Sequence, residues 1–201
     1  MVPPPDPRPL RGEPISLDLL NTTWIDAAGR HDLLEDLSGL RTWLHAHGIE
    51  RTPLSEVTRA ALVRAREALR VHVSDQAGYS AAPATGAAAA ARAAAAAEEL
   101  NAVLARGALV RALDEQGPAT RIVVDDPADL PAWTAVEDYL QLLARDPARI
   151  RRCDHLDCVL HFYDTSKRGD RRWCSMAGCG NRAKSARHYA KSRQTQQTLT
   201  D

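Results

Sequence analysis

The chain has 201 residues, of which 44% are hydrophobic and 26% charged, and its 26 Lys and Arg balance 26 Asp and Glu. This length suits one domain with a small module, or two small domains, and the apolar content is enough for a buried core. No apolar run reaches the roughly eighteen residues of a transmembrane helix, so we expect no membrane span. We find no signal peptide and expect a cytoplasmic protein whose cysteines stay reduced.

The charges are unevenly distributed along the chain. Residues 149–193 hold twelve Lys and Arg against four Asp, a net charge of +8, whereas residues 1–148 hold fourteen Arg against twenty-one Asp and Glu, a net charge of −7. The basic segment favours a polyanionic partner, and nucleic acid leads because cationic side chains release counterions from phosphates. The alternative is a solvated basic segment that docks on the acidic part of its own chain.

The chain begins with a proline-rich segment followed by an apolar one. Residues 1–9 contain five prolines, so we expect them to be disordered or extended. Asp18 and Asn21 interrupt the apolar stretch 15–22 and are candidates for lining a ligand pocket. The alternative, which we favour, is that one caps a helix and the other lies on an exposed face.

Two helices are predicted next. Leu37, Leu40 and Leu44 recur three and four residues apart and Gly48 follows, which is typical of an amphipathic helix with a glycine stop. Thr52-Pro53 has the residue types of a cap and first turn for the second helix. The buried stripe of this second helix is predicted to be Val57, Ala61, Leu62, Ala65, Leu69 and Val73. The arginines between these positions are assigned to its solvent-facing side.

Residues 74–86 contain Ser, Asp, Gly and Pro and are predicted to form a loop. Residues 87–106 are helical by propensity. The best core positions of this helix are Leu100, Val103 and Leu104.

A β-hairpin and a further helix are predicted before the cysteines. Residues 109–113 and 121–124 are rich in apolar and β-branched types and flank Gly117-Pro118, as in a hairpin. The helix spans residues 131–145, and Asp146-Pro147 ends it. Its predicted buried positions are Trp133, Val136, Leu140 and Leu143.

All four cysteines lie in the last quarter of the chain, at Cys153, Cys158, Cys174 and Cys179. Four residues separate the members of each pair and fifteen separate the pairs, so four sulfurs can converge on one tetrahedral ion. Zinc suits this set because it accepts thiolates at about 2.3 Å, and four thiolates leave no position for a catalytic water. We therefore predict one structural zinc ion. The alternatives are two disulfides or four unrelated thiols, which a reducing compartment disfavours.

A β-hairpin and a helix are predicted around the cysteines. Residues 159–164 are β-branched and aromatic, 165–170 have turn residue types, and 170–174 are predicted to return as the second strand. Residues 176–193 contain no proline and glycine only near their start, which favours a helix. Asn181 is assigned to hydrogen bonds with the nearby backbone, and a base contact is the less favoured alternative.

The residue types around the cysteines also follow a known order. Arg172-Trp173-Cys174-Ser175-Met176, followed by Cys179-Gly180-Asn181-Arg182-Ala183-Lys184, resembles the CGNR zinc-finger family, which is named after the four residues at 179–182. Phe162-Tyr163-Asp164-Thr165-Ser166 resembles the strand and turn of that family. His161 departs from the pattern, because an apolar residue is expected there.

A second resemblance precedes the first. Ile15-Ser16-Leu17-Asp18-Leu19-Leu20-Asn21-Thr22 is similar to the opening signature of the ABATE domain, with Leu19-Leu20 in place of an aromatic–aliphatic pair. ABATE domains precede CGNR fingers in a family of stress-induced bacterial regulators. The two resemblances together imply a bacterial transcription regulator.

The leading functional hypothesis is a regulator that binds DNA, or alternatively RNA, through the zinc module. The amino-terminal domain would sense a small-molecule effector, form a homodimer or contact a partner, and the protein would be associated with the nucleoid. The residues predicted to contact nucleic acid are Lys167, Arg168, Arg171, Arg172, Arg182, Lys184, Arg187, Lys191 and Arg193. A zinc-stabilised protein-interaction module without nucleic-acid binding is the second hypothesis, and an enzyme with an amino-terminal pocket is the third. We expect no enzymatic activity, since the sequence contains no Gly-rich phosphate loop, HExxH pair or GxSxG elbow.

The predicted fold is mainly α with a small β-hairpin. A helical amino-terminal domain occupies residues 10–148. A carboxy-terminal zinc module with four cysteine ligands, made of a β-hairpin and a helix, occupies residues 149–193. Residues 194–201 form a polar tail.

Overall fold

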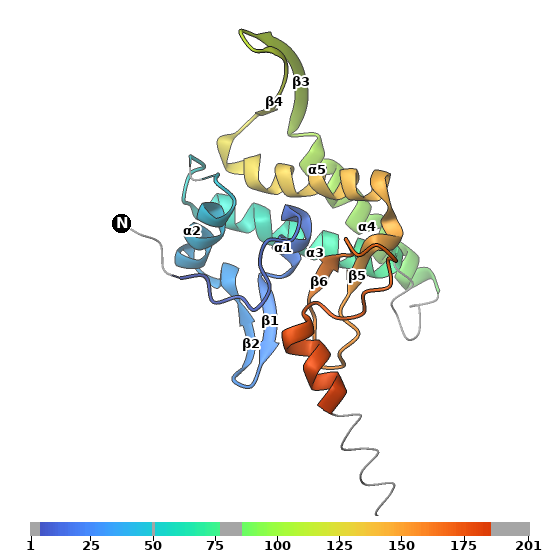
Figure 1. The fold of residues 1–201 in the computed structure, drawn as a ribbon. Coiled ribbons are helices and arrows are strands. Elements are labelled where there is room, and N and C mark those ends of the chain that lie inside the picture. The colour runs from blue at the N-terminus through green and yellow to red at the C-terminus, as the bar shows by residue number, and fades with distance from the viewer. Residues whose placement is uncertain (1–4, 50, 77–85, 186–201) are drawn as a thin grey trace, which may run out of the picture.

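The computed structural model describes residues 5–49, 51–76 and 86–185 (Figure 1). Its helices are α1 Ile15–Leu20, α2 Leu37–Ala46, α3 Glu56–Gln76, α4 Ala87–Leu104 and α5 Leu130–Arg145. Its strands form three separate antiparallel pairs, β1 Thr23–Asp26 with β2 Gly29–Asp32, β3 Gly107–Asp114 with β4 Gly117–Val124, and β5 Ile150–Arg152 with β6 His161–Tyr163. The predicted fold class, mainly α with small antiparallel sheets, is confirmed. Within the described ranges, no helix is long and apolar enough to cross a bilayer.

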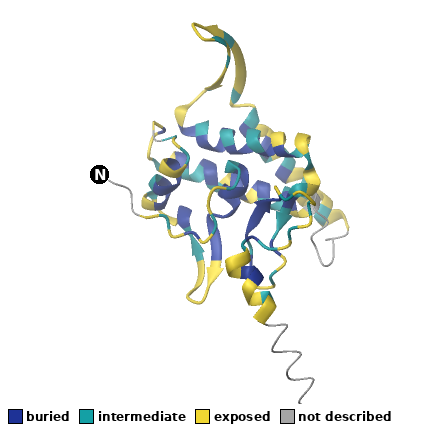
Figure 2. Ribbon diagram, viewed as in Figure 1, coloured by how far each residue is buried: buried dark blue, intermediate teal, exposed yellow. Residues whose placement is uncertain are grey.

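Helix α1 lies in the middle of the core, in contact with α3, α5 and β6. Leu17, Leu19 and Leu20 on this helix are buried, and Figure 2 shows buried residues concentrated where α1, α3 and α5 meet. A helix of six residues is too short to be stable alone in water. Its conformation therefore depends on the helices that surround it.

Helices α2 and α3 follow the predicted hydrophobic pattern with two differences at the start of α3. Helix α2 buries Leu40 and Leu44 as expected. Helix α3 begins at Glu56 rather than at Thr52-Pro53, because Ser55 accepts a hydrogen bond from the Thr58 N–H at 3.2 Å and acts as the cap. Val57 then falls in the exposed first turn and is 65% exposed, so its predicted burial is wrong. The other five positions of the stripe are buried.

Arg66 on α3 is buried, although the arginines of this helix were predicted to face solvent. It is only 3% exposed, and its guanidinium donates to both carboxylate oxygens of Asp32 at 2.6 and 2.7 Å. The same group donates to the Thr22 hydroxyl at 2.9 Å. Bidentate pairing offsets much of the cost of burying the charge, and it fixes β2 against α3.

The hairpin and the last helix of the body lie near their predicted positions. Strands β3 and β4 are joined by a two-residue turn, and the pair projects from the body (Figure 1). Helix α5 buries Trp133 and Val136 as predicted, but Leu140 is 42% exposed. Tyr139 and Leu142 are buried in its place. The face of α5 that packs on α1, α3 and α4 is therefore centred one residue before the predicted one.

The proline-rich segment is ordered where the structure describes it. Residues 5–9 were predicted to be disordered or extended, yet Arg8 is only 3% exposed. Its guanidinium pairs with Asp6 at 2.7 Å and also with the buried Asp18. Two carboxylates compensate the buried cation and hold the segment on the body. Residues 1–4, residues 77–85 of the predicted loop and the predicted polar tail 194–201 lie outside the described residues.

Candidate metal centre and basic surface

Strands β5 and β6, rather than the predicted pair 159–164 and 170–174, form the hairpin of the carboxy-terminal module. Ile150 pairs with Tyr163 and Arg152 pairs with His161. Cys153 and Cys158 lie in the loop that joins the two strands. Residues 170–174 have no strand conformation, although Asp154 N–H donates to the Arg172 carbonyl at 2.9 Å. The predicted second strand is therefore wrong, and Ile150–Arg152 takes its place.

Asp164 shapes the loop that brings the second cysteine pair to the first. Its buried carboxylate accepts hydrogen bonds from the N–H groups of Ser166 at 2.9 Å and Arg171 at 2.8 Å. Burial by itself raises the pKa of Asp164, but these hydrogen bonds outweigh it and hold the pKa below its usual value. Arg149 closes the loop by donating to the carbonyls of Asp164 and Ser166 at 2.6 and 2.9 Å.

The four cysteine sulfurs converge on one point. All four Sγ atoms lie within 4.8 Å of one another, with 3.8 Å between Cys158 and Cys174 and 3.6 Å between Cys174 and Cys179. Four sulfurs about 2.3 Å from a tetrahedral ion lie about 3.8 Å apart. The cysteines are free, which removes the disulfide alternative. The donor set and its spacing fit zinc.

The sulfurs are buried and lie within hydrogen-bond distance of one another. Hydrogen bonds from the thiols of Cys158 and Cys174 hold the pKa of Cys153 far below its usual value. The neighbouring Cys153 in turn raises the pKa of Cys158 to about 12. Without a metal ion, a buried cluster of four thiols keeps some of its protons and carries less than its full negative charge. A divalent cation that displaces these protons stabilises all four thiolates.

Two cationic side chains support the sulfurs from outside. Arg182 donates to Cys179 Sγ at 3.0 Å. Arg171 donates to the carbonyls of Trp173, at 2.9 Å, and of Cys174, and its guanidinium lies 4.3 Å from the centroid of the Phe162 ring. Arg171 therefore orients the chain at a metal ligand as well as carrying positive charge.

Two family models match the chain. Residues 149–192 match the CGNR zinc finger, and residues 13–149 match the ABATE model, described as "Putative stress-induced transcription regulator". The chain belongs to the ABATE family. Its CGNR finger carries one structural zinc ion. Cys153, Cys158, Cys174 and Cys179 are the residues that would hold it. No curated protein matches the chain.

The two polar residues of the ABATE signature are buried and bonded within the protein. Asp18 is a hydrogen-bond acceptor for Trp43 Nε1 at 3.1 Å, pairs with His47 Nε2 at 2.9 Å and forms an ion pair with Arg8. Asn21 bonds to the main chain of His161. The expectation of an exposed face position is wrong because both side chains are at most 1% exposed. Neither residue lines the two cavities described below.

His161 packs inside the protein, where the family pattern led us to expect an apolar residue. It is buried, and its Nδ1 has no hydrogen-bond partner among the described residues. Burial, and then the nearby charges of Arg152 and Arg70, lower the pKa of His161 to about 4. The ring is therefore neutral at pH 7 and fills an apolar position.

Five of the cations predicted to contact nucleic acid are exposed on the finger: Lys167, Arg168, Arg172, Arg182 and Lys184. We call these five residues the basic surface. Arg168 pairs with Asp170 at 3.0 Å and Arg172 with Asp154 at 2.7 Å, so part of their charge is compensated. Arg171 is half-buried in the structural role given above. Arg187, Lys191 and Arg193 lie outside the described residues.

The start of the finger helix is described as far as residue 185. A single π-helical turn, Met176–Gly180, contains Cys179 and runs into α-helical residues 181–185. Ser175 caps the turn by accepting from the Gly178 N–H at 3.2 Å. Asn181 donates to the Ala177 carbonyl at 3.2 Å, in agreement with its assignment to the local backbone.

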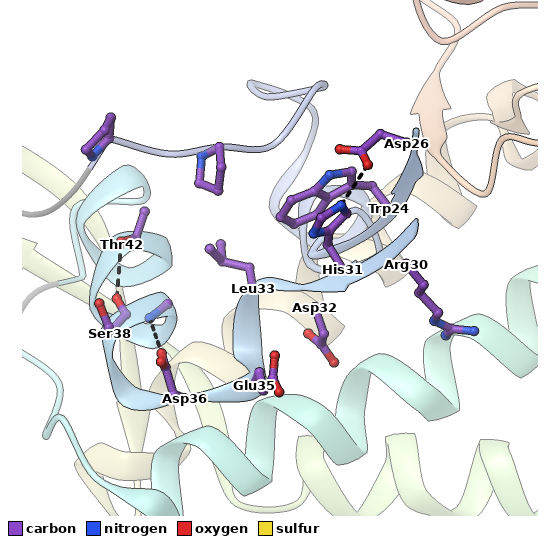
Figure 3. A pocket seen from close by; sticks show the side chains of 13 residues that line it. Trp24, Asp26, Arg30, His31, Asp32, Leu33, Glu35, Asp36, Ser38 and Thr42 are labelled. Carbon is purple, nitrogen blue, oxygen red and sulfur yellow. Dashed lines mark hydrogen bonds and ion pairs between the residues drawn. The ribbon is translucent and has the colours of Figure 1, made fainter. Parts of the chain in front are cut away.

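The ABATE domain contains a cavity of about 480 Å³ beside the β1–β2 hairpin (Figure 3). We call it the Trp24 cavity. Trp24 stacks on His31, with ring centroids 4.8 Å apart and an interplanar angle of 13°, and His31 Nε2 lies 2.8 Å from Asp26 Oδ1. Other lining residues include Pro5, Pro7, Leu33, Ser38, Gly39 and Thr42.

A second cavity, of about 220 Å³, lies between the β1 strand and the finger. Three of the zinc ligands and Arg182 line it on the finger side. Pro7, Trp24 and Asp26 line both cavities, so these residues connect the Trp24 cavity to the metal centre.

Several residues that build the site were not predicted from the sequence. Glu13 accepts from the Tyr163 N–H at 2.9 Å, and Arg8, Asp164 and Arg149 have the roles described above. Only Asp164 has a local signal, because Asp followed two residues later by Ser is typical of an Asx-turn. The partner of Glu13 is distant in sequence. Arg8 has one partner two residues away, Asp6, but only the fold brings it to Asp18.

Proposed function

We propose that this ABATE-family protein is a transcription regulator, rather than an enzyme, and that its CGNR finger binds duplex DNA. The supporting observation is the basic surface, whose five cations lie on a zinc-fixed loop and helix start. The finger keeps a net charge of about +6 after zinc binding, since a zinc ion with four thiolates carries −2. Residues 1–148 carry −7 and would repel phosphates, so binding is expected through the finger alone.

Fluorescence anisotropy with a mixed-sequence duplex across a salt series tests this proposal. Removing the cations of Lys167, Arg168 and Lys184 together should weaken binding and flatten the salt dependence by about 0.9 in slope for each lost phosphate contact. These three residues are chosen because Arg182 touches a zinc ligand and Arg171 holds the loop. Arg92→Ala, an exposed cation on α4, is the matched control.

The assay also separates the alternatives. Absence of duplex binding at low salt would favour an acidic protein surface as the partner of the basic surface. Tighter binding to an RNA of the same sequence than to the DNA duplex would assign the finger to RNA.

We further propose that the ABATE domain senses a small ligand in the Trp24 cavity. Its volume lies in the range of roughly 300–1,000 Å³ that is usual for ligand pockets, and Trp24 and Asp26 also line the cavity at the metal centre. A ligand that displaces Trp24 would therefore act on the surroundings of the zinc ligands.

Thermal-shift screening with a panel of small metabolites tests the sensing role. A true ligand should raise the Tm of the wild type but not of Ser38→Trp, whose larger side chain occupies the cavity. Ser74→Trp on the exposed side of α3 should respond like the wild type. A ligand that stabilises all three proteins equally binds elsewhere.

A further inference from the structure

The smaller of the two cavities, of about 220 Å³, borders one side of the cysteine cluster. We call it the metal-side cavity. Strand β1 forms its opposite wall, and Figure 1 shows the β1–β2 hairpin beside the finger. Cys158, Cys174 and Cys179 line this cavity, whereas Cys153 does not. Four thiolates close the coordination shell of a structural zinc ion, but here three of the four residues that supply them also face a space that a small molecule can enter.

The size and charge of the metal-side cavity favour a small, neutral reagent. At roughly 30 Å³ for each water-sized group, a hydroperoxide fits, whereas larger ligands usually occupy pockets of roughly 300–1,000 Å³. Asp26 and the metal-bound thiolates are negatively charged, which disfavours anionic oxidants. Arg182 also lines the cavity, but its guanidinium is directed at Cys179. Hydrogen peroxide is small and uncharged, and it oxidises thiolates.

Hydrogen bonds distinguish Cys174 from the other two cysteines that line the metal-side cavity. Arg182 donates to Cys179 Sγ at 3.0 Å, and the main-chain N–H of Leu160 donates to Cys158. Among the described residues, no nitrogen donates to Cys174 Sγ, whose contacts are the neighbouring sulfurs. An N–H donor stabilises a thiolate and lowers its nucleophilicity. Cys174 is therefore the most nucleophilic of the three.

We propose that Cys174 and Cys179 form a peroxide-sensitive pair that controls whether the finger keeps its metal ion. The Cys174 thiolate attacks one peroxide oxygen, so that an S–O bond forms, the O–O bond breaks and the departing hydroxide takes a proton from solvent. The Cys179 thiolate, 3.6 Å away, then attacks the sulfenic sulfur, so that an S–S bond forms and the S–O bond breaks. The second hydroxide also takes a solvent proton. Two thiolates, one peroxide and two protons thus give one disulfide and two water molecules.

The disulfide removes two of the four sulfur donors, and the remaining pair is too few for a structural zinc site. Arg182 supports the second step, because a guanidinium beside Cys179 favours the thiolate form that attacks. Loss of the metal ion would free the loops that carry the basic surface. The proposal goes beyond DNA binding and does not depend on it, since zinc release and disulfide formation are measured without nucleic acid.

Zinc release from the full, zinc-loaded chain tests the proposal, with a colorimetric chelator as the reporter and chelator without peroxide as the baseline. Ile25 lines the metal-side cavity and is 40% exposed. Ile25→Ala should speed peroxide-driven release about threefold by widening access, and Ile25→Trp should slow it about threefold. The matched control is Ile122, which is 41% exposed on β4, and its Ala and Trp variants should release zinc at the wild-type rate. Equal rates in all five proteins would overturn the proposal.

Peptide mapping identifies the sulfurs that react. Trypsin cleaves after Arg172 and Arg182 and gives peptide 173–182, which contains both Cys174 and Cys179. After free thiols are blocked, the expected disulfide leaves this peptide two hydrogens lighter and unlinked to any other. At limiting peroxide, a sulfenic-acid trap should label Cys174 ahead of Cys179. A link between peptides 153–167 and 173–182, or a trap that labels Cys153 or Cys158 first, would overturn the assignment.

Discussion

Asn21 of the ABATE domain hydrogen-bonds both main-chain groups of His161 in the CGNR finger. Asn21 Nδ2 donates to the His161 carbonyl at 2.8 Å, and Oδ1 accepts from the His161 N–H at 2.8 Å. The carboxamide thus occupies the place that a further strand would take beside β6. Both groups are buried, so water does not compete for them, and the finger is fixed on the ABATE domain.

Replacing Asn21 should loosen this contact. Asn21→Ala leaves two buried main-chain groups without partners, which should lower the free energy of unfolding by about 2–4 kcal/mol. Urea denaturation monitored by circular dichroism measures the loss. Asn101→Ala, an exposed position on α4, is the control and should change stability by less than about 0.5 kcal/mol. Equal midpoints for the two variants would show that Asn21 does not hold the finger.

Loss of one sulfur should abolish zinc binding. The wild type is expected to contain one zinc ion per chain, and Cys174→Ser should contain almost none, because Cys174 Sγ lies next to both Cys158 and Cys179. Elemental analysis after dialysis provides the measurement, and a chelator should lower the Tm of the wild type. Leu156→Ser changes an exposed residue between Cys153 and Cys158 and should retain the metal. Full zinc content in Cys174→Ser would refute the four-sulfur site.

Acidification should destabilise the protein through His161. Its folded pKa of about 4 lies below the usual histidine value of 6.5, so the unfolded chain binds the proton first and stability falls as pH decreases from about 6.5 to 4. A shift of this size corresponds to roughly 3 kcal/mol. Urea midpoints at several pH values, compared between the wild type and His161→Leu, isolate this contribution from proton-driven zinc loss, which both proteins share. The same pH dependence of the urea midpoint in both proteins would show that His161 does not cause the loss of stability.

The sequence predicted those parts of the fold whose signals are local. The leucine spacing of α2 and the spacing of the four cysteines each specify a structure within a short segment. The β3–β4 hairpin was also predicted, but Gly117-Pro118, expected between its strands, begins β4 instead, and residues 115–116 form the turn. The β5–β6 pairing was missed because Ile150-Arg151-Arg152 has the composition of a basic linker. The loop that contains Cys153 and Cys158, rather than the strand sequences, sets the register of the two strands. The burial of Arg8 and Arg66 was missed for a related reason: a buried arginine is recognisable only from carboxylates that the fold brings to it.

Gly39 shows how closely α2 packs on the turn before it. A Cβ added at this position would lie 1.5 Å from the Leu33 carbonyl oxygen, far inside contact distance, and that oxygen belongs to backbone that cannot rotate away. Gly39→Ala should therefore separate α2 from the turn and lower the free energy of unfolding by about 3 kcal/mol. Gly178→Ala is the control, since the nearest atom to its added Cβ is 3.7 Å away. Because Gly39 also lines the Trp24 cavity, Gly39→Ala should weaken ligand binding there as well, whereas Gly178→Ala should not. Urea midpoints that agree for the two variants would show that this packing is looser than the structure indicates.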